Sequence, residues 1–248
     1  MRRGIDFLRA YEDIEIEGTY NTRDIGGVMN KDDNVLSKRK FIRSASLSGI
    51  TKKGFETVKN LNVDCIIDIR TKAEMEFDPN SFIGYEGIDY YAIPMKDYYH
   101  DIYLNGLNDD FPDTKVKLYI WMIDHNRVAI RKIFKILADE KYRTIIHHCS
   151  SGKDRTGIIT MLILKLLDVS NELILEDFIY SKERLTKIVN TMEVKRDTNM
   201  PEYYFNIDAN DLLGLIDYID NHYKNVLSYL KSIGINESDV QRLRRKLI

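Results

Sequence analysis

Residues 145–167 read IIHHCSSGKDRTGIITMLILKLL, in which an apolar run, a short polar turn and a longer apolar run follow one another. The first four residues have the compact apolar character of a buried strand that ends at His148. The turn from Cys149 to Asp154 consists of small and charged residues, and an apolar helix is expected to begin near Arg155. This stretch therefore predicts a strand, a tight loop and a helix, the unit from which α/β proteins are built.

Other segments of the chain carry strand and helix signals of their own. The apolar runs VDCIIDIR and GIDYYAIPM predict two more buried strands. Ile14 and Ile16 alternate with acidic residues, which predicts an edge strand. Thr51 is placed to cap the helix that follows it.

The order of these segments predicts the fold class. Strands alternate with helices over residues 1–150, whereas residues 151–248 are mostly helical. We expect an α/β fold with a central, mostly parallel sheet flanked by helices on both faces, and a helical C-terminal half. Neither a Gly/Ser linker nor an internal repeat interrupts the chain, so we expect residues 1–248 to form a single domain.

Composition excludes several classes of function. The 37 basic and 39 acidic residues leave a net charge of -2, so we expect no nucleic-acid partner. No window approaches the roughly 18 apolar residues of a membrane span, so we expect no integral membrane segment. The two cysteines, Cys65 and Cys149, are too few for a disulfide framework, which favours a cytoplasmic location. The oligomeric state is not predicted by any pattern in the sequence.

The predicted loop has the properties of an anion site. Ligands of α/β sheets bind beyond the carboxyl ends of strands, where a loop leads into a helix. Ser150, Ser151 and Gly152 allow the backbone to curl so that several N–H groups point at one spot. Arg155 can hold an oxyanion with two parallel N–H bonds, and Lys153 adds a second positive charge. We therefore expect residues 150–155 to bind a phosphate group.

Cys149 lies at the start of this loop, where the same positive field acts on its thiol. A thiol beside cationic groups and a helix N-terminus is expected to exist as a thiolate, which is a strong nucleophile. Such a sulfur is poised to attack a bound phosphoryl group and form a covalent intermediate that water cleaves. Thr156 could donate a hydrogen bond to the sulfur and help it leave in the second step.

Two other interpretations of the motif are weaker. A nucleotide-binding loop of the GxxxxGK[ST] type requires glycine at His147 and a hydroxyl at Asp154. A zinc site would use neighbouring residues of a strand, His147, His148 and Cys149, whose side chains point to opposite faces. We therefore predict neither a metal ion nor a cofactor.

The motif HCSSGKDRTG resembles the HCxxGxxR[ST]G signature of cysteine-dependent protein tyrosine phosphatases, and its GKDRTG form is similar to the atypical bacterial tyrosine/dual-specificity family. NTRDIGG, IRSASLS, IIDIR, YAIP and YLKSIGINESDVQRLRRKL resemble other blocks of that family in the same order, from about residue 19 to the end. The resemblance implies that Cys149 is the nucleophile, Arg155 the phosphate clamp and residues 150–154 the backbone cradle. It also implies metal-independent hydrolysis of phosphotyrosine, sometimes of phosphoserine or phosphothreonine, and in some members of phosphoinositides.

The general acid has more than one candidate. Loss of a tyrosyl oxygen requires a proton donor, which is typically worth about 10²–10⁴-fold in rate. The resemblance to the bacterial family implies Asp154, inside the loop, and this is the assignment we favour. Asp97 and Asp101, which follow a predicted strand, are the alternatives on a separate loop.

Several residues are candidates for supporting roles. We expect His148 to orient the loop through a hydrogen bond, and Cys65 to be a core thiol. Asp68 and Arg70 end a predicted strand and are expected to form a salt bridge beside the site. Arg23 and Asp24 are expected to pair and hold a turn, with contact to the substrate as the alternative.

These expectations lead to one principal function and two alternatives. The principal function is hydrolysis of phosphotyrosine in a phosphorylated protein, with phosphoserine or phosphothreonine as possible further substrates. The first alternative is a phosphoinositide phosphatase, because Lys153 could meet a second phosphate group. The second is a phosphate-binding module without catalysis, which would be expected to have lost Cys149 or Arg155, and both are present.

Overall fold

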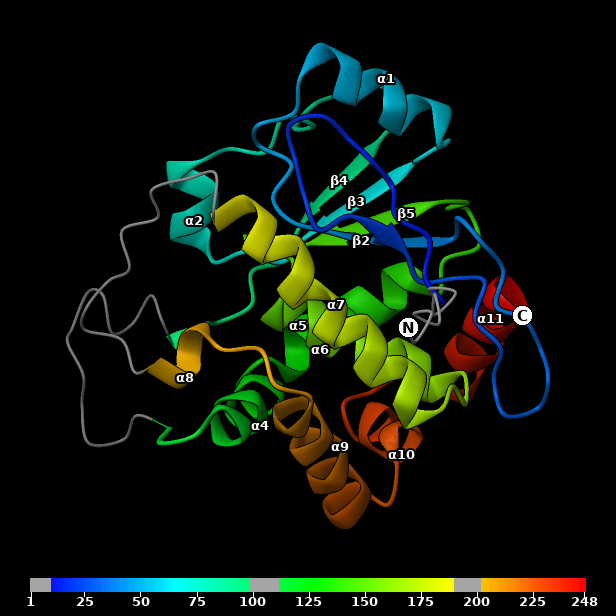
Figure 1. The fold of residues 1–248 in the computed structure, drawn as a ribbon. Coiled ribbons are helices and arrows are strands. Elements are labelled where there is room, and N and C mark those ends of the chain that lie inside the picture. The colour runs from blue at the N-terminus through cyan, green and yellow to red at the C-terminus, as the bar shows by residue number, and fades with distance from the viewer. Residues whose placement is uncertain (1–9, 99–111, 190–201) are drawn as a thin grey trace, which may run out of the picture.

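The computed structural model describes residues 10–98, 112–189 and 202–248, which fold around one five-stranded sheet (Figure 1). The strand order is β1-β2-β5-β3-β4. Strand β1 runs antiparallel to β2, and the other neighbours are parallel. The strands are β1 (Arg23–Asp24), β2 (Phe41–Ser44), β3 (Cys65–Asp68), β4 (Asp89–Ala92) and β5 (Ile145–His148). The expected mostly parallel sheet is therefore confirmed.

The register of the three central strands brings their carboxyl ends together. His148 at the end of β5 pairs with Ser44 of β2 on one side and with Asp68 of β3 on the other. The loops that follow these strands consequently open at the same edge of the sheet, which is where ligands of parallel sheets bind.

Alternate residues of the strands supply two hydrophobic cores. Ile42, Ile66 and Ile146 belong to the smaller core, which also contains Val58 of α1 (Lys52–Asn60). Phe41 and Ile145 point to the opposite face and join the larger core. Successive side chains of a strand thus point to opposite faces of the sheet, and apolar residues occupy both faces. This pattern is typical of strands that are buried on both sides. Helix α1 lies on one side of the sheet and most other helices lie on the other (Figure 1).

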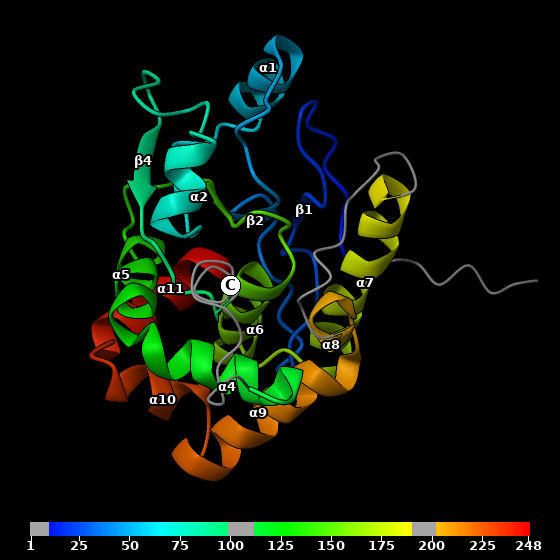
Figure 2. The same ribbon diagram turned by 90° about the vertical axis from the view of Figure 1, so that its left-hand side faces the viewer.

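Helices of the second half of the chain form most of the larger layer (Figure 2). Helix α6 (Asp154–Leu166) is central to it, because 11 of its residues are buried. Around it lie α4 (Lys115–His125), α5 (Arg127–Leu137), α7 (Asn171–Val189), α9 (Ala209–Tyr223), α10 (Val226–Ser232) and α11 (Glu237–Leu247). Two short helices, α2 (Lys72–Phe77) and α8 (Glu202–Phe205), complete the described part of the fold. The predicted helical C-terminal half is thus confirmed within the described residues.

Local predictions had mixed outcomes. The Thr51 hydroxyl accepts a hydrogen bond from the Gly54 N–H and caps α1, as expected. The edge strand expected around Ile14 and Ile16 is wrong, because only Asp13 forms an isolated bridge there and β1 itself lies at Arg23–Asp24. Both isoleucines are instead buried in the smaller core. Among the described residues, no helix combines the length and the apolar character needed to cross a membrane.

Candidate active site

The loop from Cys149 to Lys153 joins β5 to α6, which begins at Asp154, one residue before the position expected. Cys149 is 2% exposed and unpaired. Gly152 has a φ of 68°, and a Cβ there would lie 2.6 Å from the Ser44 carbonyl oxygen. Glycine is required at this position because both the left-handed backbone and the close approach to β2 exclude a side chain.

The carbonyl groups and the N–H groups of the loop backbone differ in their hydrogen-bond partners. The carbonyl oxygens of Cys149 and Ser150 accept hydrogen bonds from His148 Nδ1 (3.0 Å) and the Ser46 N–H (2.9 Å). Within the described residues, the N–H groups of residues 150–153 have no acceptor. Lys153 occupies the N-cap of α6 and supplies no side-chain cap, so the first N–H groups of that helix also lack an acceptor among the residues that the structure describes. Free N–H groups at a helix N-terminus form an anion site.

Arg155 is held by two carboxylates at the edge of the loop. Its two terminal nitrogens donate to the carboxylate oxygens of Glu74 at 2.6 and 2.8 Å, in bidentate geometry. Its Nε lies 3.3 Å from Asp97 Oδ2. The Arg155 and Asp97 side chains are only 6% and 8% exposed, so this contact is shielded from water. Asp97 therefore lies directly beside the guanidinium that we expect to hold phosphate.

Glu74 is a site residue that the sequence analysis missed. It lies in the first turn of α2, where its carboxylate caps the Thr71 N–H and the Thr71 hydroxyl accepts from the Glu74 N–H. The Ser150 hydroxyl also donates to it. Burial alone would raise the pKa of Glu74, but hydrogen bonds from Arg155 and Ser150 lower it well below its ordinary value. Glu74 is consequently an anion that orients Arg155.

Asp154, the general acid that the sequence analysis favours, lies among cationic groups. Tyr119 donates to its Oδ1 at 2.5 Å, and the ammonium groups of Lys115 and Lys153 lie 3.4 and 3.2 Å from its carboxylate. Burial alone would raise the pKa of Asp154, but the two lysines and the Tyr119 hydrogen bond lower it to about 2. A general acid must hold a proton before the reaction, so this environment argues against that role for Asp154. The Lys153 ammonium also donates to the Tyr204 carbonyl and is therefore engaged outside the loop.

His148, which precedes Cys149, is a buried, neutral ring. Its Nδ1–H donates to the Cys149 carbonyl, and its Nε2 accepts from Asn80 Nδ2 at 2.8 Å. Burial lowers the pKa of His148, although Asp68, 3.6 Å away, opposes this effect. These contacts are those of a residue that orients the loop, and a neutral ring fixed by two partners has no free nitrogen to act as a base.

The remaining predicted residues occupy supporting positions. Arg70 donates to both carboxylate oxygens of Asp68, at 3.0 and 2.7 Å, so the expected salt bridge is present. The expected pairing of Arg23 with Asp24 is wrong. Asp24 accepts the N–H groups of Gly26 and Arg39 and holds the turn alone, whereas Arg23 pairs with Asp177 of α7.

Thr156, next to the loop, and Cys65, at the start of β3, are both buried. The Thr156 hydroxyl oxygen is buried and has no hydrogen-bond partner within the described residues, so it is available to the sulfur or to a ligand. Cys65 is fully buried in the larger core, and burial raises the pKa of its thiol. Cys65 is therefore the expected core cysteine, with no disulfide to Cys149.

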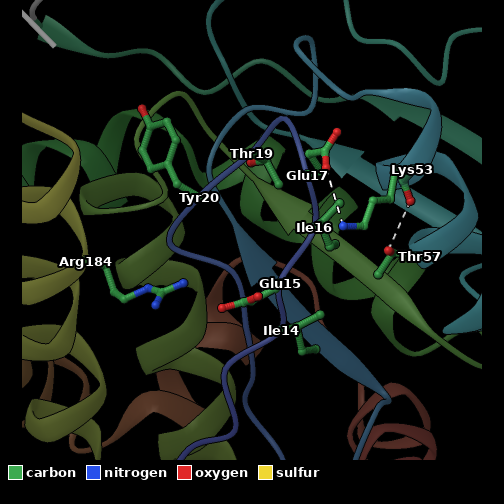
Figure 3. Close-up of a pocket in the computed structure, with 9 residues that line it drawn as sticks. All are labelled: Ile14, Glu15, Ile16, Glu17, Thr19, Tyr20, Lys53, Thr57 and Arg184. Atoms are coloured by element: carbon green, nitrogen blue, oxygen red, sulfur yellow. Dashed lines mark hydrogen bonds and ion pairs between the residues drawn. The ribbon is translucent and has the colours of Figure 1, made fainter. Parts of the chain in front are cut away.

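A hollow of about 440 Å³ lies beside residues 14–20, just before Asn21, whose side chain contacts the Cys149 loop (Figure 3). Side chains from the N-terminal segment, α1 and α7 surround it. Its lining consists of Ile14, Glu15, Ile16, Glu17, Thr19, Tyr20, Lys53, Thr57 and Arg184. Burial and the nearby Cys149 sulfur raise the pKa of Tyr20, and the Thr19 hydroxyl lies 3.3 Å from Ser44. Tyr20 and Thr19 thus connect this hollow with the surroundings of the loop.

The strand, the cysteine-containing loop and the arginine at the start of α6 together form the candidate active site. The chain matches the family described as "Tyrosine phosphatase family" over residues 14–248. It therefore belongs to the tyrosine phosphatase family and is an enzyme of the protein tyrosine phosphatase class.

Individual relatives are distant. A tyrosine-protein phosphatase of Nostoc commune is 25% identical over 217 residues, covering 84% of this chain and 74% of the relative. The triple specificity protein phosphatase PtpB of Mycobacterium tuberculosis is 22% identical over 278 aligned positions, covering 94% and 98%. Among solved structures, the catalytic core of Siw14 is similar at 16% identity and a TM-score of 0.47, covering 90% of this chain and 99% of that one.

Proposed function

We propose that the protein hydrolyses phosphotyrosine in proteins, without a metal ion, through a cysteinyl-phosphate intermediate on Cys149. The observation that carries the proposal is a buried cysteine at the base of a loop whose N–H groups have no acceptor in the described part of the chain, next to the guanidinium of Arg155. These groups can surround a phosphoryl group and leave the sulfur below its phosphorus atom.

The reaction proceeds in two displacements. In the first, the Cys149 sulfur attacks phosphorus, the bond from phosphorus to the tyrosyl oxygen breaks, and a general acid gives that oxygen a proton. In the second, water attacks phosphorus, the sulfur–phosphorus bond breaks, and the same carboxylate accepts a proton from the water. Arg155 and the N–H groups of residues 150–153 hold the three non-bridging oxygens throughout. The Thr156 hydroxyl, which has no partner among the described residues, donates to the departing sulfur.

Asp97 is the general acid in this proposal. It contacts Arg155 at Nε, so a phosphate on Arg155 would lie beside it. Arg155 favours the ionised form of Asp97 before substrate binds, but a phosphate dianion next to this carboxylate favours the protonated acid, which is the form that donates to the leaving oxygen. Asp154 faces two lysines instead and acts as their counterion. The other separate-loop candidate, Asp101, lies outside the described residues.

The surroundings of the loop support a protein substrate. The hollow beside Tyr20 receives the segment next to the phosphotyrosine (Figure 3). A phosphoinositide remains the alternative, but the Lys153 ammonium that would favour it is engaged by Asp154 and Tyr204.

A cytoplasmic location and a single domain over residues 1–248 are part of the proposal. Two unpaired cysteines support the location, and two cores packed on one sheet support the domain.

Steady-state hydrolysis tests the proposed function. A phosphotyrosine peptide, a phosphoserine peptide and a phosphoinositide are compared with and without chelator, for the parent, Cys149→Ser and Cys65→Ala. We expect fastest turnover of the phosphotyrosine peptide, resistance to chelator, and loss of turnover in Cys149→Ser only. Full activity of Cys149→Ser would contradict the mechanism, and faster turnover of the phosphoinositide would contradict the substrate.

A further inference from the structure

Asn21 touches the back of the loop from the NTRDIGG segment, which the reaction itself does not use. Its side-chain Nδ2 donates to the carbonyl oxygens of Ser151 and Gly152, both at 3.0 Å. Asn21 is fully buried, and its φ of 53° is left-handed, a conformation that asparagine tolerates better than most residues. One amide group therefore holds two successive carbonyls of the loop.

Arg43 of β2 holds the next part of the loop from the same side. Its Nη2 donates to the Gly152 carbonyl at 2.6 Å and lies 3.4 Å from the Lys153 carbonyl. The side chain is fully buried, and its Nη1 pairs with Asp177 of α7. Arg43 consequently connects the loop to the sheet and to α7 at once.

Asp177 and Arg23 fix these two donors. Asp177 accepts Arg43 on one carboxylate oxygen and Arg23 Nε on the other, at 2.6 Å for the latter. Arg23 also donates to the Asn21 side-chain oxygen at 2.7 Å, which leaves the Asn21 amide nitrogen facing the loop. The Ser181 hydroxyl accepts a further bond from Arg23 at 3.0 Å. All of these side chains are at most 2% exposed.

With these contacts, every carbonyl of residues 149–153 accepts a hydrogen bond from outside the cradle. His148 and Ser46 serve the first two, and Asn21 and Arg43 the others, with the Gly157 N–H also donating to Lys153 at 2.8 Å. A peptide unit whose carbonyl is held outward must direct its N–H the other way. The N–H groups of residues 150–153 therefore point into the cradle because the carbonyl groups of the same peptide units are held on its outside.

We propose that Asn21 and Arg43 are positioning residues for the reaction, which set the direction of the loop peptides and so create the phosphate cradle. The inference rests on the proposed function, because it assigns these residues to the same loop. Asp177 and Arg23 hold the side chains of Arg43 and Asn21 in the orientations from which they donate to the loop carbonyls. The network also places two arginines against one aspartate behind the loop, and the excess positive charge favours anions there.

The test replaces Asn21 by aspartate and Arg43 by lysine in the full chain. Asn21→Asp keeps the shape and the oxygen that Arg23 contacts, but removes the two N–H donors. We expect kcat for a phosphotyrosine peptide to fall about tenfold to a hundredfold, and the inhibition constant of inorganic phosphate to rise about tenfold. Arg43→Lys keeps the positive charge but has a single nitrogen to donate to both Asp177 and the Gly152 carbonyl. We therefore expect a smaller fall in kcat and a smaller rise in the inhibition constant of phosphate.

Asn30→Asp is the matched control. Asn30 is also buried, and its Nδ2 donates to a main-chain carbonyl at 3.0 Å, but that carbonyl belongs to Leu167 at the far end of α6. We expect this variant to lose stability while kcat and phosphate inhibition change less than about twofold. Unchanged kcat and inhibition in folded Asn21→Asp, or equal losses in Asn30→Asp, would overturn the inference. A parent that binds phosphate without hydrolysing any ester would instead contradict the proposed function alone.

Discussion

Two buried aspartates in this protein are each flanked by two cations, but they differ in what surrounds them. Asp177, behind the loop, pairs with Arg23 and Arg43, whose side chains are fully buried. Asp239, in the first turn of α11, pairs with Lys135 and Arg242, whose side chains are 43% and 34% exposed. The cations of Asp239 can keep part of their hydration, whereas those of Asp177 cannot.

The difference indicates why each aspartate is present. Removing three charged groups from water is costly, and apolar residues of similar volume are often as stable as a buried ion pair. The Asp177 network is therefore poorly explained by stability alone, but it is explained by the loop carbonyls that Arg43 and Asn21 hold. Asp239 also accepts the Asn236 N–H in a capping box, which is sufficient to explain its presence at the start of α11.

The largest effect is expected at Arg155 itself. Arg155→Lys keeps one positive charge but loses the planar pair of donors that Glu74 orients. We predict that kcat/KM for a phosphotyrosine peptide falls about 10³-fold. Arg242→Lys, the equivalent change beside Asp239, should leave kcat/KM unaltered. Comparable losses in both variants would contradict the distinction between the two regions.

The general acid is tested by two substitutions on opposite sides of the loop. We predict that Asp97→Asn lowers kcat about 10²-fold on a phosphotyrosine peptide, and by less on an aryl phosphate whose leaving group is more acidic. Asp154→Asn should reduce kcat to the same extent on both substrates, because it only unbalances Lys115 and Lys153. A leaving-group dependence in Asp154→Asn, and none in Asp97→Asn, would reverse the assignment.

A direct comparison of the two aspartates sharpens the contrast. Asp177→Asn leaves two buried arginines without the carboxylate that both of them contact, and should cost about 3–5 kcal/mol of unfolding free energy. Asp239→Asn has half-exposed partners and should cost about 1 kcal/mol. In assays on the folded fraction, we expect kcat to fall about tenfold in Asp177→Asn and to stay unchanged in Asp239→Asn. Urea unfolding and kcat are measured on the same samples, and unchanged kcat in folded Asp177→Asn would separate the network from catalysis.

The smallest effect concerns the pH dependence of stability. Burial, together with the charge of Arg43, lowers the pKa of His147 to about 3. Unfolded histidine titrates near 6.5, so between these values the unfolded state binds a proton that the folded state refuses. Stability should therefore fall on acidification through this window, by at most about 1.4 kcal/mol per pH unit for this residue. His147→Gln, which keeps a donor for Thr160, should reduce that slope in urea unfolding between pH 6.5 and 5. An identical slope would contradict the buried neutral ring.

The parts of the site that are local in sequence could be predicted, and those that join distant segments could not. The strand, loop and helix around Cys149 follow from one continuous stretch. Glu74 is 81 residues from Arg155, and Asp177 is 154 residues from Arg23. Only the T-x-x-E capping signature at Thr71 marked Glu74, and that pattern indicates a helix start, not an arginine partner.

The same limit applies to the role of Asp154, for which the sequence favoured the general acid. Its closeness to Cys149 is fixed by the sequence, but its protonation depends on Lys115 and Tyr119 of α4, which the fold brings against it. Likewise Arg23 is next to Asp24 in the NTRDIGG motif, yet its ion-pair partner is Asp177 of α7. Short-range patterns predict a nucleophile and a phosphate clamp, whereas the charge state of each carboxylate is decided by tertiary contacts.

The most direct test of the account is to follow the phosphoryl group itself. The parent enzyme is mixed with a radiolabelled phosphotyrosine peptide in the presence of chelator, quenched within one turnover, and digested to locate the label. We predict a transient adduct on the peptide that contains Cys149, formed before inorganic phosphate is released and missing in Cys149→Ser. Release of labelled phosphate with no adduct at any time, or a label on another residue, would contradict the proposed mechanism.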